Sequence, residues 1–451
     1  MALTISQVVG RIKADVGAAL SASVIEAVCG DLDVVYRKRI LDPVNTVHAF
    51  LAQVLHGNVA CTAVADLVNK SFSAEAYCKA RGRLPVEFFD ALFDAVNEGL
   101  RDERQTNGLW RGHRTWLVDG SSFSMADEKE LLAYFGQPGN QKPGCGFPVA
   151  HMLALFHAGA GFLQRLVLAP MRTHDMADAA KMLPELGEGD ILIADRGFAS
   201  FAHLALISQG KRHAVFRCHQ KQIVDFRPHR KHRKSKKDPA GLPTSRWLKR
   251  LGRHDQLVEY QKPQAKPVWM TQEEYDKLPA TVVVRELRFK VKRPARTRTI
   301  TVVTTLLDPV RYPAEAIAEL YGLRWGVETD LRHLKTTMRM EVLHCKTVAG
   351  VQKEALMFAI VYNLVRLVML EASRRQKVLL PRISFIDALR WLRTATPQTP
   401  LRPLIVNPNR PGRLEPRAVK RRPKEYDRLN KPRRELQKAL RKPKPKKRLT
   451  A

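Results

Sequence analysis

The chain has 451 residues, 45% of them hydrophobic, and its Lys and Arg residues exceed Asp and Glu by 33. A folded protein with so large a positive surplus is suited to binding a polyanion, and nucleic acid is the first candidate. The six cysteines form no CxxC pair, which argues against a zinc module and against a disulfide framework. No uninterrupted apolar run reaches about 18 residues, and the N-terminus lacks a secretory core, so we expect a cytoplasmic protein with no membrane partner.

Residues 1–105 are predicted to form a helical N-terminal domain. The segments 47–55, 60–70 and 85–100 have apolar residues at helical spacing. A basic segment at residues 79–83 makes this domain a candidate for binding DNA ends. A helical bundle with another role is the alternative.

From residue 114 the pattern changes from helical to strand-like. Short β-prone runs and two helical segments follow in the order β-β-β-α-β-α-β, which is the order of an RNase H-like mixed sheet. We therefore expect an α/β fold, with the first part of its core at residues 112–218. The expected elements are strands at residues 115–119, 149–157, 162–168, 191–194 and 214–218 and helices at residues 177–186 and 201–208.

Two aspartates occupy comparable positions in this pattern. Asp119 ends the first expected strand, and Asp195 follows the apolar run at residues 191–194, each beside a turn that contains glycine. Asp-Gly is first of all a turn signal, so neither aspartate alone indicates a site. Together with Glu328 on a later helix, they supply three oxygen ligands of the kind that suit Mg²⁺ or Mn²⁺.

Residues 219–310 are predicted to form a β-rich basic insertion in the core. The insertion opens with a cationic run at residues 227–237. A charge run is usually a solvated loop, but these cations are also suited to neutralising DNA phosphates beside a site. The strand-like segments that follow are residues 257–261, 281–291 and 298–307.

The segment YGLRWGVETDLRHLK, residues 321–335, is predicted to be one continuous helix in the second part of the core, residues 311–400. At about 100° per residue, an aromatic side chain, two cations and a carboxylate share one stripe along this helix. A solvated face with an Arg324–Glu328 pair is the alternative. The stripe contains Tyr321, Arg324, Glu328 and Lys335, and the apolar flank contains Leu323, Val327, Leu331, Leu334 and Met338.

The C-terminal segment, residues 401–451, is rich in Lys, Arg and Pro. It contains 19 basic and 4 acidic residues. Such a composition predicts a basic tail that is disordered without DNA. We expect it to act as a clamp that binds DNA of any sequence, with a solvated tail of no specific role as the alternative.

Taken together, these motifs resemble those of DDE-class transposases of bacterial insertion sequences, in the family marked by a Tyr-x2-Arg-x3-Glu-x6-Lys pattern. Residues 321–335 have this spacing without a gap. The Asp-Gly context of Asp119 and the Asp-Arg-Gly-Phe context of Asp195 match the two other acidic motifs of the family. The resemblance runs from residue 30 to residue 425.

The resemblance implies a role for each of these residues. Asp119, Asp195 and Glu328 would hold two Mg²⁺ or Mn²⁺ ions, which activate an attacking water or 3′-hydroxyl and stabilise the leaving oxygen. The implied partner is double-stranded DNA, both the terminal repeats of the element and its target, bound by a homodimer. The implied DNA contacts are Tyr321, Arg324, Trp325 and Lys335, and Arg332 is a further candidate because it lies near Glu328 on the helix.

Three functions compete at this level. A transposase needs the three carboxylates and specific binding to terminal inverted repeats. A catalytically inactive or domesticated DNA-binding relative would keep the positive charge and lose the metal site. An RNase H-like nuclease would cut DNA without pairing two ends. The intact acidic set argues against the inactive relative, and the Tyr-Arg-Glu-Lys spacing argues against a plain nuclease.

Overall fold

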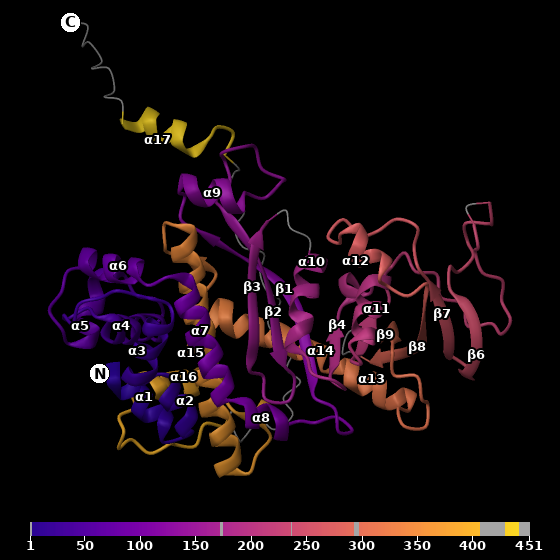
Figure 1. Ribbon diagram of the computed structural model, residues 1–451, viewed down its shortest axis with the longest axis horizontal. Coiled ribbons are helices and arrows are strands. Elements are labelled where there is room, and N and C mark those ends of the chain that lie inside the picture. Colours follow the sequence, from indigo (N-terminus) through magenta and orange to yellow (C-terminus); the bar gives the residue numbers. More distant parts are fainter. Residues whose placement is uncertain (1, 172–174, 236, 293–296, 406–428, 442–451) are drawn as a thin grey trace, which may run out of the picture.

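A large mixed sheet with helices packed around it dominates the computed structural model (Figure 1), which describes residues 2–171, 175–235, 237–292, 297–405 and 429–441. The described strands form one ten-stranded sheet in the order β3-β2-β1-β4-β5-β9-β8-β7-β6, and β10 pairs with β1 off this path. Helices from the N-terminal hundred residues lie at one end of the molecule, and the last strands of the sheet lie at the other. The fold is therefore mixed α/β with an N-terminal group of helices.

The first five strands follow the predicted order, except that a helix absent from the prediction, α9 (Lys129–Phe135), lies between β1 and β2. β1, β4 and β5 run parallel to one another, whereas β2 is antiparallel to β1 and β3 is antiparallel to β2. All four residues of β4 are buried, as expected for a strand covered on both faces. The elements are β1 (Thr115–Met125), β2 (Val149–His157), β3 (Leu163–Pro170), α10 (Asp175–Met182), β4 (Ile191–Ala194), α11 (Phe201–Gln209) and β5 (His213–Arg217).

One boundary in this group differs from the prediction. β1 does not stop at Gly120 but continues to Met125. The antiparallel ladder with β2 pairs Asp119 with Ala154 and Gly120 with Leu153, so the backbone partners that β2 offers outweigh the local turn signal. Asp119 therefore lies inside a strand and not at its end.

The predicted insertion extends the core sheet instead of forming a sheet of its own. Its strands are joined by antiparallel pairing, and β9 pairs with β5 of the core. β6 and α12 were not expected from the sequence. The elements are β6 (Arg246–Gly252), β7 (Asp255–Gln261), α12 (Gln272–Asp276), β8 (Thr281–Lys292) and β9 (Thr297–Thr304).

The N-terminal hundred residues are helical, as predicted. Asp42 caps α4, the most completely buried helix of this group: its carboxylate accepts a hydrogen bond from the amide of Asn45 at 2.7 Å, and Pro43 occupies the first turn. The helices are α1 (Ala2–Gly10), α2 (Ala14–Ala19), α3 (Ala22–Asp31), α4 (Pro43–Leu55), α5 (Val64–Val68), α6 (Ala74–Arg83), α7 (Val86–Gly99) and α8 (Arg101–Thr106).

A long apolar helix, α15 (Val348–Gln376), joins the N-terminal helices to the sheet. It is long and apolar enough to cross a membrane, but 94% of its most apolar window is buried inside the protein, which is the property of a core helix. Its Asn363 bonds to both backbone groups of Leu163 on β3 at 2.8 Å and to Asn97 on α7 at 3.1 Å. These bonds connect three parts of the chain that lie far apart in sequence.

The remaining elements complete the second half of the molecule and the C-terminus. α17 is a helix within the segment that was expected to be disordered, and its Arg433 lies 3.6 Å from the ring centre of Phe147. Residues 406–428 and 442–451, the rest of the expected basic tail, lie outside the described residues. The elements are α9 (Lys129–Phe135), α13 (Ala314–Gly322), α14 (Arg324–Arg332), β10 (Val342–Leu343), α16 (Phe385–Thr394) and α17 (Arg433–Arg441), with a π-helical turn at His333–Thr337 and 3-10 turns at Cys61–Ala63, Leu183–Glu185, Arg196–Phe198 and Leu380–Arg382.

Candidate active site

Two of the predicted carboxylates lie side by side because of strand register. β1 and β4 are parallel neighbours, and Leu117 pairs with Ile193. Asp119 and Asp195 each stand two residues beyond that pair, so they lie level with each other on the same face of the sheet, Asp119 inside β1 and Asp195 directly after the end of β4. The Asp119 carboxylate accepts a hydrogen bond from the amide of Gly120 at 2.9 Å. The parallel pairing of β1 and β4 therefore accounts for the predicted proximity of the two aspartates, although β1 continues beyond Asp119 to Met125.

The third carboxylate comes from α14, which packs against β1. Glu328 Oε1 accepts a hydrogen bond from Arg324 Nη2 at 2.9 Å, and Arg324 Nη1 lies 4.0 Å from Asp119 Oδ2. The Glu328 side chain is 58% exposed, whereas that of Arg324 is only 12% exposed. One guanidinium thus connects the helix carboxylate to the strand carboxylate.

The helix that carries these residues is not continuous. α13 ends at Gly322, α14 begins at Arg324, and a π-helical turn follows from His333. The prediction of one continuous helix over residues 321–335 is therefore wrong. Leu323 of the expected apolar flank, which separates α13 from α14, is 43% exposed, although the rest of that flank is buried. π turns inside helices are frequent at functional sites.

Burial and neighbouring charges both shift the pKa values of Asp119 and Arg324. Burial raises the pKa of Asp119, and the neighbouring Asp195 and Glu328 act in the same direction, while the Gly120 amide and Arg324 lower it. Burial alone would lower the pKa of Arg324, but Tyr321, Glu328 and Asp195 raise it above the usual value. The three carboxylates therefore influence the same guanidinium, and Arg324 stays charged.

Arg217 is a further cation at this edge, and the sequence did not single it out. It ends β5, the parallel neighbour of β4, and its Nη1 lies 3.8 Å from Asp195 Oδ1. The available signal was its position at the end of a buried strand, β5, which neighbours the strand that precedes Asp195. With Arg324, it places an arginine within 4.0 Å of each of the three carboxylates.

The donor chemistry of this site suits a divalent metal, although the side chains are not gathered around one point. In the described part of the chain, no three His, Cys, Asp or Glu side chains are grouped closely enough to hold an ion. Asp195 Oδ1 is buried without a hydrogen-bond partner, which leaves an acceptor available at the sheet edge. Three carboxylates on different elements are the ligands that Mg²⁺ and Mn²⁺ prefer, and Glu328 would have to leave Arg324 to join them.

Lys335 reaches the same region from the π turn. Its Nζ donates a hydrogen bond to Ser121 Oγ at 3.0 Å, and Ser121 lies two residues after Asp119 on β1. Burial lowers the pKa of Lys335, and Glu341 opposes that change. The amine is therefore held beside the acidic group and does not belong to a solvated face. Ser121 was not identified from the sequence.

The other predicted DNA contacts are placed differently. Tyr321 is 1% exposed and packs edge-on against Phe289 and Trp325, so its ring is not available to stack on DNA in this conformation. The expected contact of Tyr321 with DNA stays a prediction, and in the described structure the ring packs in the core. Trp325 is partly buried with the Arg324 guanidinium 5.5 Å from its ring centre, and Arg332 is exposed at the end of α14.

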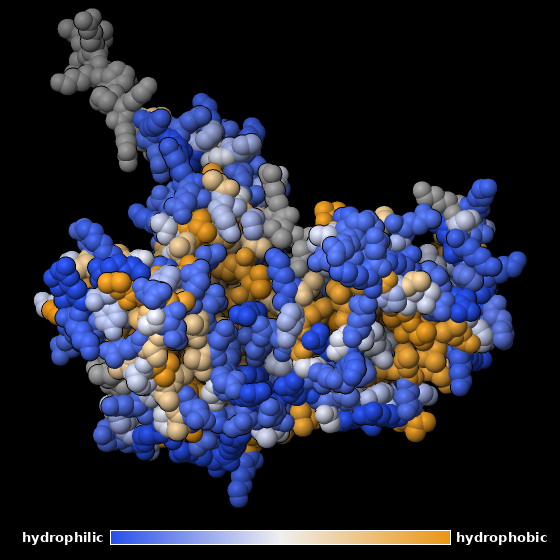
Figure 2. Space-filling view, in the orientation of Figure 1, coloured by the Kyte–Doolittle hydropathy of each residue, from blue (hydrophilic) through white to orange (hydrophobic). Residues whose placement is uncertain are grey.

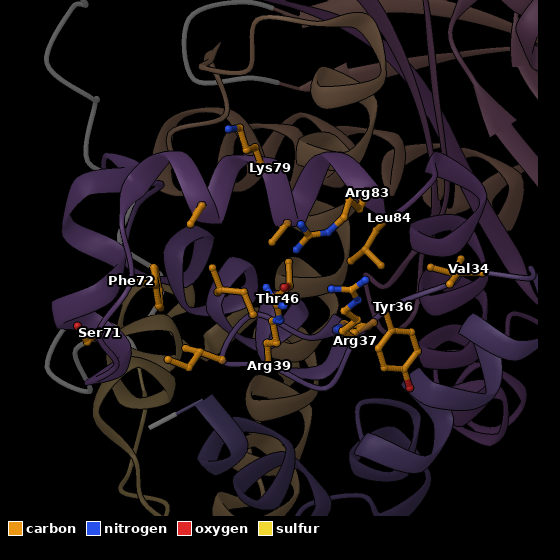
Figure 3. Close-up of a pocket in the computed structure, with 16 residues that line it drawn as sticks. Val34, Tyr36, Arg37, Arg39, Thr46, Ser71, Phe72, Lys79, Arg83 and Leu84 are labelled. Carbon is orange, nitrogen blue, oxygen red and sulfur yellow. The ribbon is translucent and has the colours of Figure 1, made fainter.

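A second basic feature lies among the N-terminal helices (Figure 3). It is a groove of about 870 Å³ between the loop before α4 and helix α6, and none of its lining residues is acidic. Of the basic segment at residues 79–83, Lys79 and Arg83 line the groove, whereas Arg81 is buried and lies 3.9 Å from the ring centre of Phe50. The cations of the groove are Arg37, Arg39, Lys79 and Arg83.

The mixed sheet and its three neighbouring carboxylates, Asp119, Asp195 and Glu328, can be compared with known protein families. The transposase DDE domain family matches residues 110–364, which is more than half of the chain and includes the three carboxylates. The chain therefore belongs to this family, and the resemblance inferred from its motifs is confirmed.

Individual relatives are more distant. The chain is 24% identical over 379 residues to the transposase InsG for insertion sequence element IS4 of Escherichia coli (strain K12), an alignment that covers 79% of each protein. Among solved structures, it is similar to the piggyBac transposase in a synaptic complex with hairpin DNA. That similarity has a TM-score of 0.43 and 11% identity and covers 84% of this chain and 79% of the other.

Proposed function

We propose that this protein is an active DNA transposase. It binds the terminal inverted repeats of its own insertion element and carries out metal-dependent strand cleavage and strand transfer by in-line displacement at phosphorus. The observation that carries the proposal is the register of Asp119 on β1 with Asp195 directly after its parallel neighbour β4, with Glu328 of α14 joined to Asp119 through Arg324. The strands β1 to β5 form the RNase H-like core of this proposal, and the later strands form its insertion.

The metal site of the proposal consists of Asp119, Asp195 and Glu328. Two Mg²⁺ or Mn²⁺ ions held there would lower the pKa of the attacking water or 3′-hydroxyl and stabilise the leaving oxygen. The protein contributes a sheet edge that fixes the two aspartates two residues beyond a paired position. No covalent link between protein and DNA is required, and the burial of Tyr321 agrees with its having no role as a nucleophile.

The cations around the carboxylates bind the DNA backbone in this proposal. Lys335 is held beside Asp119 by Ser121, so its charge is placed where the scissile phosphate approaches. Arg324 offers a planar fork for a phosphate, and Arg332 adds an exposed charge further along α14. Tyr321 positions Arg324 from the core side, and Trp325 is the candidate contact for an unpaired base.

Recognition of the element ends is assigned to the N-terminal helices. The groove with four cations and no acidic lining residue provides charge complementarity to duplex DNA. The face shown in Figure 2 is mostly hydrophilic, with hydrophobic patches near its middle and on its right. The net charge of +33 agrees with a protein that meets a polyanion. We place the protein in the bacterial cytoplasm, at the nucleoid, as a homodimer when bound to two element ends.

Excision from a plasmid tests the function directly. The gene would be cloned between its native flanking sequences, and the released ends would be mapped for the wild type and for Glu328→Gln. Glu319→Gln is the matched control, since Glu319 is an exposed carboxylate on α13. We expect excision at inverted repeats by the wild type and by Glu319→Gln, but not by Glu328→Gln.

The negative outcomes separate the alternatives. Specific binding to the flanks without excision by the wild type would indicate an inactive relative. Cleavage of generic DNA in Mg²⁺ without specific binding to the flanks would indicate a plain nuclease. Normal excision by Glu328→Gln would remove Glu328 from the metal site.

A further inference from the structure

The acidic group at the sheet edge is neutralised from within the chain. The guanidinium of Arg324 donates a hydrogen bond to Glu328 at 2.9 Å and lies 4.0 Å from Asp119. An exposed pair spaced i,i+4 on a helix contributes little, but this arginine is 12% exposed and is shared by two carboxylates from different elements. It is therefore a built contact and not a chance pairing on the surface.

We propose that Arg324 occupies the place of a metal cation between Asp119 and Glu328 until DNA binds, and that a DNA phosphate then draws it away. DNA binding and metal binding are thereby cooperative. The inference rests on the proposed function, because it takes these carboxylates to be the metal ligands. The inference adds that the carboxylates accept a metal ion only after DNA has drawn Arg324 away from them.

Two features of the contact allow the exchange. Arg324 donates a hydrogen bond to Glu328 at 2.9 Å, but it lies 4.0 Å from Asp119, beyond hydrogen-bond distance, so the two carboxylates do not saturate its donors. A phosphate can accept two parallel hydrogen bonds from an arginine fork, which is a stronger arrangement than two separate contacts. A phosphate therefore competes effectively with Glu328 and Asp119 for Arg324.

The surroundings of Arg324 hold it near the carboxylates in the absence of DNA. Tyr321 is buried beneath it, and the ring of Trp325 lies 5.5 Å from its guanidinium carbon. Glu328 has the opposite character, since its side chain is 58% exposed and able to turn. Release of Arg324 frees Glu328 to join Asp119 as a ligand, so each binding event favours the other by the same factor.

The coupling is measurable without catalysis. Free Mn²⁺ would be followed by electron paramagnetic resonance while it is titrated into the full-length protein. The titration is run with the protein alone and with a short duplex that ends at the element terminus mapped by excision. For the wild type, we expect DNA to tighten Mn²⁺ binding by about 5- to 150-fold, the usual range of coupling between two sites. Equal Mn²⁺ affinity with and without DNA would overturn the proposal on the wild type alone.

Arg324→Gln separates this coupling from other effects. Without DNA, the variant should bind Mn²⁺ more tightly than the wild type, and the gain from adding DNA should fall below about 5-fold. Arg196→Gln is the matched control, because Arg196 adjoins Asp195 but bonds to Gln220 at 2.9 Å instead of a carboxylate. If Arg196→Gln tightened Mn²⁺ binding without DNA as much as Arg324→Gln does, the effect would be general electrostatics, and the proposal would be overturned.

The remaining outcomes are also decisive. A full DNA-dependent gain in Arg324→Gln would mean that the phosphate acts as a metal ligand by itself, which overturns the proposal. If Arg324→Gln does not fold, Arg324→Lys keeps one charge but loses the fork, and it should show a smaller coupling than the wild type. Asp119→Asn distinguishes a failure of the Arg324 exchange from a failure of the proposed function. Unchanged Mn²⁺ binding by this variant would contradict the metal site of the proposed function itself.

Discussion

The contact between Lys335 and Ser121 leads to a quantitative prediction. Lys335 Nζ lies 3.0 Å from Ser121 Oγ, two residues from Asp119 on the same strand. In the proposed function, a charge held there faces the phosphate to be cut. Hydrogen bonds to charged groups contribute about 1.5–3 kcal/mol. At about 1.4 kcal/mol per tenfold change, Lys335→Ala should weaken DNA binding by roughly 10- to 150-fold.

The salt dependence of binding gives a second measure of the same contact. Loss of one phosphate contact should reduce the slope of log K against log salt by about 0.9. Fluorescence anisotropy of a labelled duplex at several salt concentrations measures both quantities. Lys346→Ala is the control, since Lys346 is 76% exposed and lies 3.6 Å from Glu128, away from the acidic group.

Ser121→Ala distinguishes the position of the amine from its charge. The variant keeps Lys335 but removes the hydroxyl that holds it, so strand cleavage should fall while the salt slope stays that of the wild type. If Lys335→Ala changes neither the slope nor the cleavage rate, the reasoning is refuted and Lys335 belongs to a solvated face after all.

Three further outcomes are expected. Asp119→Asn and Asp195→Asn should each abolish strand cleavage in Mg²⁺ yet shift the same duplex in a gel, and near-normal cleavage would remove that residue from the metal site. Deletion of residues 430–451, which carry ten basic residues and one acidic residue, should flatten the salt dependence of non-specific binding. Asp255→Ala should lower the free energy of unfolding in urea by about 3–5 kcal/mol, because it leaves the buried Arg285 without its carboxylate.

The sequence predicted those elements whose burial leaves a clear pattern. β4 is apolar at all four positions, and its bounds and those of β2 were predicted correctly. β6 was missed because it is an edge strand of mixed polarity, RWLKRLG, with no fully buried position. The end of β1 was wrong because Gly120 indicates a turn locally, whereas pairing with β2 continues past it. Long-range pairing is not visible in a single local window.

The candidate site was predicted in part for a similar reason. Asp119 and Asp195 could be brought together from strand order alone, because parallel neighbours place their carboxyl ends at one edge. The burial of Tyr321 could not be predicted from a helical projection, since the projection shows which residues share a face and not which neighbours cover that face. Arg217 carried no motif at all, and only its strand neighbours bring it to Asp195.

The three carboxylates differ in how firmly the fold places them. Asp119 lies within a strand that is paired on both sides, and Asp195 directly follows a buried strand, so the backbone of the sheet determines both positions. Glu328 stands on a helix bounded by a break and a π turn, and its side chain is directed to Arg324. In the proposed metal site, the sheet thus preorganises two ligands, and the third depends on the partner of one arginine. In this proposal, the site is inactive without DNA although Asp119 and Asp195 are already in position. Only Glu328 and Arg324 have to exchange partners when DNA binds.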